Sequence, residues 1–97
     1  MCGITGVVLG SKVRSASDIE AIKHSFIKSL VAAESRGTDA AGLFVINEGG
    51  EHYFYRAPVR AQKLVATDSF WDVLDQVGSS TIAIVGHTRA ATTGDPI

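Results

Sequence analysis

The order of short apolar runs and amphipathic stretches constrains the fold of this 97-residue chain more than any other feature. Residues 3–9 form a run rich in Ile and Val that ends at Gly10, which is typical of a buried strand near the chain terminus. Residues 18–33 then carry apolar side chains at helical spacing, and Ser17 with Glu20 matches a capping box at their start. We therefore expect a strand followed at once by a long helix.

The rest of the chain predicts a hairpin, a short helix and a further strand. Residues 41–46 and 51–56 are β-prone and are separated by a loop that contains two glycines, the pattern of a β-hairpin. A short helical stretch begins at Asp68 and ends before Gly78. Residues 81–85 form another apolar strand, which runs into Gly-His-Thr-Arg and a loop that contains Gly and Thr. The apolar side chains of the short helix fall on one side: Phe70, Leu74 and Val77.

This order of elements indicates an α+β fold, with a sheet packed by helices. Strands and helices alternate too irregularly for a doubly wound parallel sheet, and no G-x-G-x-x-G follows the first strand. With 45% hydrophobic and 20% charged residues, the chain has the composition of one globular unit. We expect residues 1–97 to form a single unit.

Charge and hydropathy argue against two classes of partner. The net charge is −1, and the nine Lys and Arg residues are scattered, so no basic surface for nucleic acid is predicted. No apolar run approaches the roughly 18 residues that a membrane helix needs, and the start lacks the pattern of a secretory signal. We expect a cytoplasmic protein that binds neither nucleic acid nor membrane.

The single cysteine, Cys2, has two interpretations. One cysteine cannot form an internal disulfide or a multi-cysteine zinc site, so Cys2 is either a small apolar residue of the strand or a reactive thiol. Removal of Met1 would place the thiol beside its own α-amine, whose pKa of about 7.7 to 8.0 suits a base near neutral pH. A nucleophile paired with a terminal amine needs no distant histidine. Position alone does not choose between the two interpretations.

Three segments together carry a resemblance: MCGI at residues 1–4, ESRGTDAAG at residues 34–42 and GHTRAATTG at residues 86–94. They resemble the class II glutamine amidotransferases, which open with Cys-Gly-Ile, carry Arg-Gly-x-Asp-x-x-Gly after the first helix, and have Gly-His-Thr-Arg-x-Ala-Thr-x-Gly after a strand. The resemblance implies the first half of an N-terminal-nucleophile (Ntn) hydrolase αββα sandwich with largely antiparallel sheets. It covers the first part of a longer domain, so we expect the unit to be incomplete at its C-terminus.

The resemblance also implies an activity. Cys2, with its α-amine as the base after Met1 removal, would attack the side-chain amide of glutamine and release ammonia, and hydrolysis would then release glutamate. It implies no cofactor and no metal. The ammonia acceptor stays open among sugar phosphates, nucleotide precursors, amino acids and oxoglutarate, because acceptor specificity in the family resides in a separate domain.

Arg89 and Thr92 are the candidate substrate-binding residues. By resemblance, Arg89 clamps glutamine and Thr92 assists. A guanidinium among glycines and hydroxyls can make a bidentate pair with an α-carboxylate. The alternative is an arginine that braces its loop through backbone carbonyls.

Four residues are expected to support the site: Gly3, Arg36, Gly37 and His87. By resemblance, the turn that contains Arg36 lies beside the nucleophile and helps to order it. The alternative is a simple helix-terminating turn with a surface ion pair, in which Gly37 is the residue that follows the helix. We interpret His87 as a hydrogen-bonding structural histidine, because the α-amine already supplies a base.

Two departures from the family pattern bear on activity. Ala90 and Thr93 stand where many relatives have Trp and His, which predicts a smaller wall for the glutamine pocket. The family's oxyanion-hole Asn-Gly and its amine-binding Asp lie beyond residue 97. The alternative function is therefore a catalytically inactive fragment or interaction module of the same fold. Exposed strand edges would favour a homo-oligomer.

Overall fold

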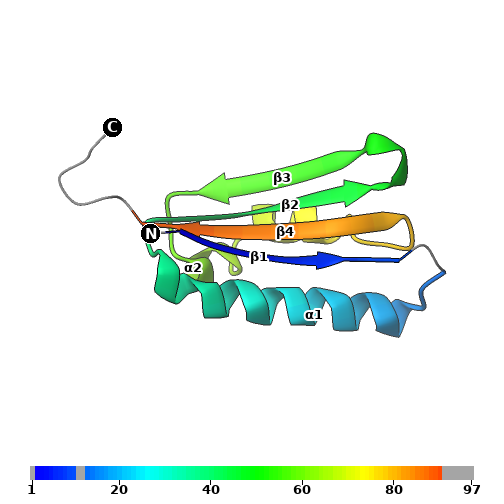
Figure 1. The fold of residues 1–97 in the computed structure, drawn as a ribbon, viewed down its shortest axis with the longest axis horizontal. Helices are drawn as coiled ribbons and strands as arrows, with labels where there is room; N and C mark the ends of the chain where they lie inside the picture. The colour runs from blue at the N-terminus through cyan, green and yellow to red at the C-terminus, as the bar shows by residue number, and fades with distance from the viewer. Residues whose placement is uncertain (1, 11–12, 91–97) are drawn as a thin grey trace.

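A computed structural model of the chain describes residues 2–10 and 13–90, which form one antiparallel sheet with helices on one of its faces (Figure 1). The elements in chain order are β1 (Cys2–Val8), α1 (Ala16–Ala32), the 3₁₀ helix η1 (Ala33–Arg36), β2 (Ala40–Asn47), the 3₁₀ helix η2 (Glu48–Gly50), β3 (His52–Ala57), α2 (Ala61–Leu64), α3 (Asp68–Leu74) and β4 (Thr81–Arg89). The structure confirms the predicted α+β class, including the β2–β3 hairpin, and is compatible with the first half of an Ntn-hydrolase fold. None of the helices in the described ranges is long and apolar enough to cross a membrane.

The strand order, β1-β4-β2-β3, brings the two ends of the described chain together. The last strand, β4, lies between β1 and β2 and is antiparallel to both (Figure 1). Cys2 at the start of β1 is paired with Arg89 at the end of β4, and Ala40 at the start of β2 pairs with the same arginine. This register places the first and third sequence motifs at one end of the sheet.

The long helix begins two residues earlier than predicted, and its capping box uses a different pair. The Ser15 hydroxyl accepts a hydrogen bond from the Asp18 amide at 3.1 Å, and the Asp18 carboxylate accepts one from the Ser15 amide at 3.2 Å. The prediction of Ser17 and Glu20 was wrong because both pairs have the same spacing. Ser17 instead lies in the first turn, where its hydroxyl hydrogen-bonds that of Ser15.

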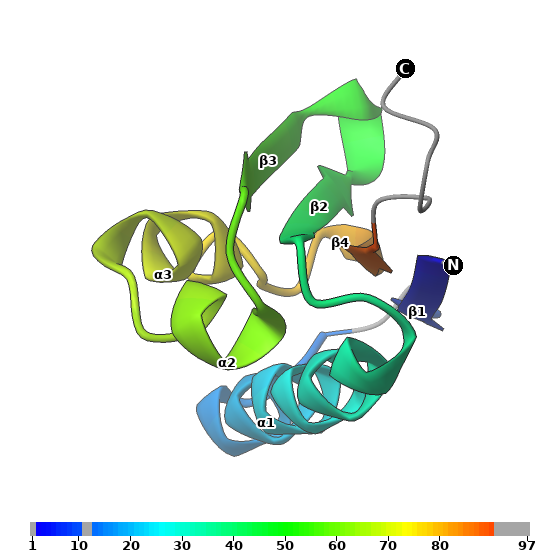
Figure 2. The ribbon, with the colours of Figure 1, turned by 90° about the vertical axis from the view of Figure 1, so that its left-hand side faces the viewer.

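The core lies between the helices and one face of the sheet, as Figure 2 shows. Phe26 and Leu30 of α1 are fully buried, and they contact β4 at Gly86. A Cβ built on Gly86 would lie 2.9 Å from side-chain atoms of both residues, so this glycine lets α1 approach the sheet closely. Phe70 and Leu74 of the short helix are buried as predicted. Val77 is buried too, but it lies beyond the helix, which ends at Leu74 and is therefore shorter than predicted.

Two further elements differ from the predictions. Strand β4 continues to Arg89, so His87 and Arg89 are strand residues, whereas the sequence predicted that the strand ends at Val85. Pairing with both β1 and β2 stabilises this extension, although Gly86 looks like a strand breaker in the sequence. The second difference is α2, whose four residues are too few to show a helical period.

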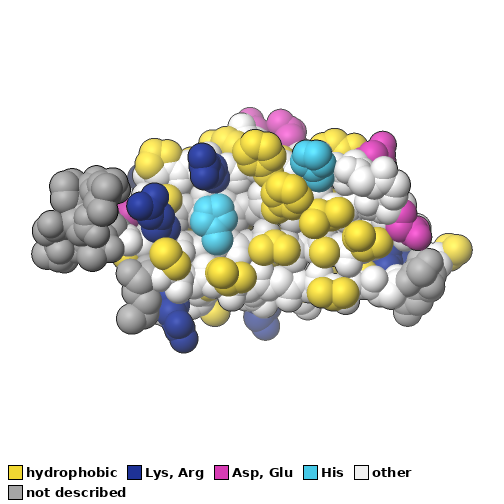
Figure 3. All heavy atoms as spheres, turned by 45° about the horizontal axis from the view of Figure 1, so that its top comes forward, with side chains coloured by type: hydrophobic (Ala, Val, Ile, Leu, Met, Phe, Trp, Pro, Cys, Tyr) yellow, Lys and Arg dark blue, Asp and Glu magenta, His cyan; other side chains and the backbone are white. Residues whose placement is uncertain are grey.

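The face of the sheet away from the helices is open and carries exposed apolar side chains. Ile4 and Val8 of β1 are 80% and 90% exposed, and Phe54 of β3 is 62% exposed. Phe44 on β2 stacks with His52 at a centroid distance of 5.5 Å. Figure 3 shows apolar side chains gathered on the molecular surface, with basic side chains and one of the two visible histidines nearer one end.

Candidate active site

The open face has a polar end, which the strand register assembles. The side chains of alternate residues share a face of a sheet, and residues that are paired across strands lie side by side. Cys2, Arg89 and Ala40 form the row at the end of the sheet. The next row on the same face contains Ile4, His87, Gly42 and Arg56. A thiol, two guanidinium groups and an imidazole therefore share one end of one face.

Cys2 is exposed and lies directly opposite Arg89. Cβ atoms of directly opposed residues in antiparallel strands are about 5 Å apart, so the thiol and the arginine stem are neighbours. In this structure Cys2 is therefore not a buried side chain of the strand. An exposed thiol beside a cation has the setting of a reactive cysteine.

Gly3 packs the N-terminal motif, residues 1–4, against the motifs at residues 34–42 and 86–94. It is buried, and a Cβ built on it would lie 2.7 Å from the Thr88 hydroxyl oxygen and 3.0 Å from the Arg36 Cβ. The Thr88 hydroxyl in turn donates a hydrogen bond to the Ala33 carbonyl at 2.8 Å. The end of the α1–η1 segment is thus held against the start of β1, which places the Arg36 turn against Gly3, the residue that follows Cys2.

Gly37 packs against the backbone of the third motif. Gly37 directly follows η1, and its amide donates a hydrogen bond to the Glu34 carbonyl at 3.0 Å. Its φ of −176° is extended backbone, which does not by itself require a glycine. A Cβ on Gly37 would lie 2.4 Å from the carbonyl carbon of Arg89 and 2.7 Å from the Ala90 nitrogen. The Asp39 amide donates to the Arg89 carbonyl at 2.9 Å. The Arg36-Gly37 turn therefore supports the backbone that carries Arg89.

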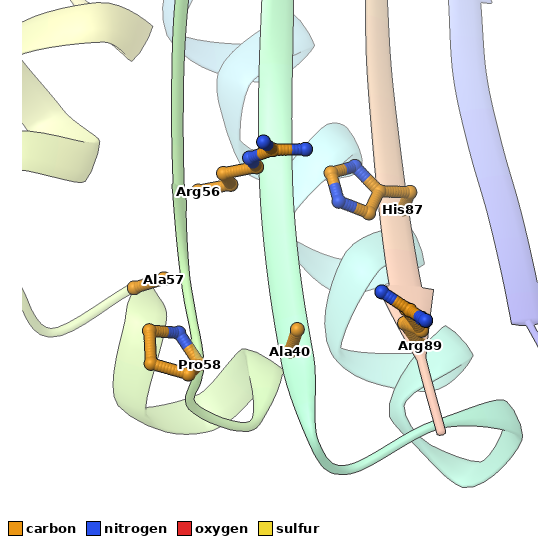
Figure 4. Close-up of a pocket in the computed structure, with 6 residues that line it drawn as sticks. All are labelled: Ala40, Arg56, Ala57, Pro58, His87 and Arg89. Atoms are coloured by element: carbon orange, nitrogen blue, oxygen red, sulfur yellow. The ribbon is translucent and has the colours of Figure 1, made fainter. Parts of the chain in front are cut away.

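A hollow of about 320 Å³ lies beside Arg89 on the open face. Figure 4 shows the residues that line it: Ala40, Arg56, Ala57, Pro58, His87 and Arg89. Nothing in the sequence marked Arg56, because it lies outside the three motifs and only the β2–β3 register brings it beside His87. Thr92 and Thr93, which the sequence placed at the glutamine pocket, lie outside the described residues.

The pKa of His87 lies below its ordinary value of 6.5. Burial of the ring is the main cause, and the positive charge of Arg56 adds to it. Within residues 2–10 and 13–90 the ring makes no hydrogen bond, and the structural role of His87 stays a prediction. His87 is therefore a neutral imidazole at pH 7.

Stability should fall as the pH decreases below about 6.5. Above this value His87 is neutral in both folded and unfolded chains and contributes nothing. Below it the unfolded chain binds a proton first, because the pKa of His87 is lower in the folded chain. Denaturant midpoints measured above and below pH 6.5 check this, with His87→Gln expected to flatten the profile. An equally steep profile in His87→Gln would assign the pH dependence to other groups.

The fold and this end of the sheet define an α+β domain with a candidate cysteine nucleophile on its first strand. Curated relatives show its family. The chain is 38% identical over 96 residues to glutamine–fructose-6-phosphate aminotransferase of Halalkalibacterium halodurans, 36% to that of Bacillus licheniformis and 34% to that of Bacillus subtilis. Each match covers 99% of the chain and 13% of the relative. The chain belongs to the class II glutamine amidotransferases and matches the N-terminal glutaminase domain of these relatives.

Two other comparisons are less specific. No family model matches the chain. Among solved structures, a chain in a complex of the β-clamp processivity factor and the little finger domain of PolIV is similar with a TM-score of 0.54. This match covers 95% of the chain and 90% of that chain at 10% sequence identity, so it is a similarity of fold alone.

Proposed function

We propose that this chain carries the nucleophile and part of the substrate clamp of a glutaminase that releases ammonia from glutamine. The main support is the exposed Cys2 opposite Arg89, at the point where all three family motifs pack together. The chain spans about 13% of the length of the curated relatives, so the activity is a proposal for the full-length protein.

The reaction uses the α-amine of Cys2 once Met1 has been removed. The amine takes the thiol proton, and the thiolate attacks the side-chain carbonyl carbon of glutamine. The carbon–nitrogen bond then breaks, the amine returns the proton to the leaving ammonia, and a thioester remains on Cys2. Water, deprotonated by the amine, attacks the thioester and releases glutamate. If Met1 is retained, the Cys2 nitrogen is an amide and cannot act as the base.

Arg89 supplies the counter-charge for the substrate's α-carboxylate in this proposal. Its position in the row of Cys2 lets one amino acid bridge the thiol and the guanidinium. We expect Arg89→Lys to raise the KM for glutamine about tenfold or more, since lysine lacks the bidentate fork. Equilibrium binding of glutamine and thermal unfolding should be measured together. A loss of stability with unchanged affinity would instead assign Arg89 to bracing the backbone.

The experiment that tests the function is an ammonia assay on protein whose N-terminus has been verified by mass spectrometry. Glutamine-dependent ammonia release from a Met1-free sample is the expected result. No release from such a sample of the full-length protein would favour the alternative, a non-catalytic interaction module. The exposed apolar side chains of the open face support the further prediction of a homo-oligomer, which size-exclusion chromatography would check.

The names of the relatives suggest the acceptor. They are glutamine–fructose-6-phosphate aminotransferases, so we propose a sugar phosphate as the ammonia acceptor of the full-length protein. Formation of an amino sugar phosphate from glutamine and fructose 6-phosphate tests this. The glutaminase step can be assayed independently of the acceptor.

A further inference from the structure

The hollow beside Arg89 contains a second guanidinium group that the glutaminase step described above does not use. Arg56 on β3 lines this hollow with His87 and Arg89. Figure 4 shows the Arg56 side chain directed across β2 toward the imidazole of His87. The register explains this, because Arg56 pairs with Gly42 and Gly42 pairs with His87. The central strand β4 and the edge strand β3 thus bring their cationic or polar groups together across β2.

Gly42 provides the space in which these side chains meet. A Cβ built on Gly42 would lie 2.5 Å from the His87 Cε1 and 2.7 Å from the Arg56 Cβ. The glycine has no positive φ, so backbone conformation does not require it. Its missing side chain lets the imidazole and the arginine stem approach each other over β2.

The positive charges of the hollow are not compensated within the described part of the chain. Across residues 2–10 and 13–90, the ion pairs are those of Lys23 with Glu20 and Asp75, so neither Arg56 nor Arg89 is paired with a carboxylate there. His87 is neutral near pH 7, and the hollow therefore has the charge of two guanidinium groups. Two positive charges at one site repel each other. An anion bound between them would offset this electrostatic repulsion.

We propose that Arg56 is a specificity-determining residue that joins Arg89 in binding the α-carboxylate of the amino-acid substrate. This inference rests on the proposed glutaminase function. Guanidinium forks match a carboxylate geometrically, and the volume of about 320 Å³ suits a small ligand group. Ala57 and Pro58 form the apolar side of the hollow.

The test is the affinity of the full-length protein for glutamine, measured by calorimetry in a Cys2→Ala background that prevents turnover. Arg56→Gln should weaken binding about tenfold, the usual effect of losing one charge-assisted hydrogen bond. Arg56→Lys should recover part of this loss. The matched control is Arg60→Gln, which removes the same charge from an exposed arginine outside the hollow and should leave the affinity unchanged.

A second ligand shows whether Arg56 recognises the carboxylate. Glutaminamide, in which an amide replaces the α-carboxylate, should bind more weakly than glutamine to the parent protein. The difference between the two ligands should shrink in Arg56→Gln, whereas a purely structural role would leave it unchanged. Unchanged glutamine affinity in Arg56→Gln, or binding of inorganic phosphate in preference to glutamine, would overturn the inference.

These outcomes are separable from those of the proposed function. Arg56-dependent glutamine binding in a protein that releases no ammonia would contradict the glutaminase proposal and support the carboxylate site. Ammonia release with a glutamine KM that Arg56→Gln does not change would support the glutaminase and contradict the role of Arg56.

Discussion

Replacing Cys2 with alanine should abolish glutamine-dependent ammonia release, lowering kcat by about 10⁴-fold or more, as removal of a nucleophile typically does. In the proposed reaction the thiol forms the thioester. Among the described residues, the polar side chains that share its end of the open face are Arg89, His87 and Arg56, and none of them is a comparable nucleophile. Cys2 is exposed on the open face, so its truncation should leave the core and the unfolding temperature unchanged. Ammonia release and thermal unfolding of the full-length protein measure the two effects.

The state of the N-terminus provides the control for this prediction. Protein that retains Met1 keeps the thiol but has an amide in place of the α-amine, so it should be nearly as inactive as Cys2→Ala. Comparison of samples with and without Met1 therefore separates the nucleophile from the base. Activity of Cys2→Ala within tenfold of the parent would remove Cys2 from the mechanism. Full activity with Met1 retained would assign the base to another group.

Gly37→Ala should produce the second large effect, because the new Cβ would meet backbone atoms that cannot rotate away. It would lie 2.4 Å from the Arg89 carbonyl carbon and 2.6 Å from the Arg89 nitrogen. Overpacking of this kind costs about 1–3 kcal/mol and moves the backbone. Because the displaced residue is the proposed substrate clamp, we expect kcat/KM for glutamine to fall about 10²-fold, the effect of a misplacement near 1 Å.

Gly78→Ala is the matched control for Gly37→Ala. Gly78 has no positive φ, and a Cβ built on it meets nothing within 4 Å. The same change in composition should therefore leave both stability and glutamine kinetics near those of the parent. If Gly37→Ala also behaved like the parent, the turn would not support Arg89. Packing of residues 34–42 against residues 86–94 would then not affect glutamine kinetics.

The sequence predicted best those elements in which the spacing of apolar residues matches the face that is buried in the core. The helical spacing of Phe26 and Leu30 predicted the side of α1 that packs on the sheet, and both residues are fully buried. The hairpin followed from two β-prone runs around a glycine-containing loop. The capping pair of α1 was predicted wrongly. Ser15 with Asp18 and Ser17 with Glu20 offer the same chemistry at the same spacing, so the local sequence does not distinguish them.

The candidate site was predicted only in part, because its geometry depends on strand register. The motifs predicted Cys2 and Arg89, but they placed Arg89 after the strand, whereas pairing with both neighbouring strands keeps it within β4. Arg56 had no sequence signal. It lies 31 residues before His87 in the numbering, and only the shared pairing with Gly42 brings the two side chains together.

The sequence by itself determined the α+β class, the family motifs and Cys2 as the candidate nucleophile, because periodicity and residue chemistry are local properties of the chain. The tertiary structure decided which of these residues share a face of the sheet. It also decided at which positions only glycine fits, because a Cβ there would approach atoms of other elements too closely. Gly3, Gly37 and Gly42 have no local signature of their role, since their constraint comes from atoms distant in sequence. Insertion of β4 between β1 and β2 places Cys2 opposite Arg89, and this non-local pairing builds the site.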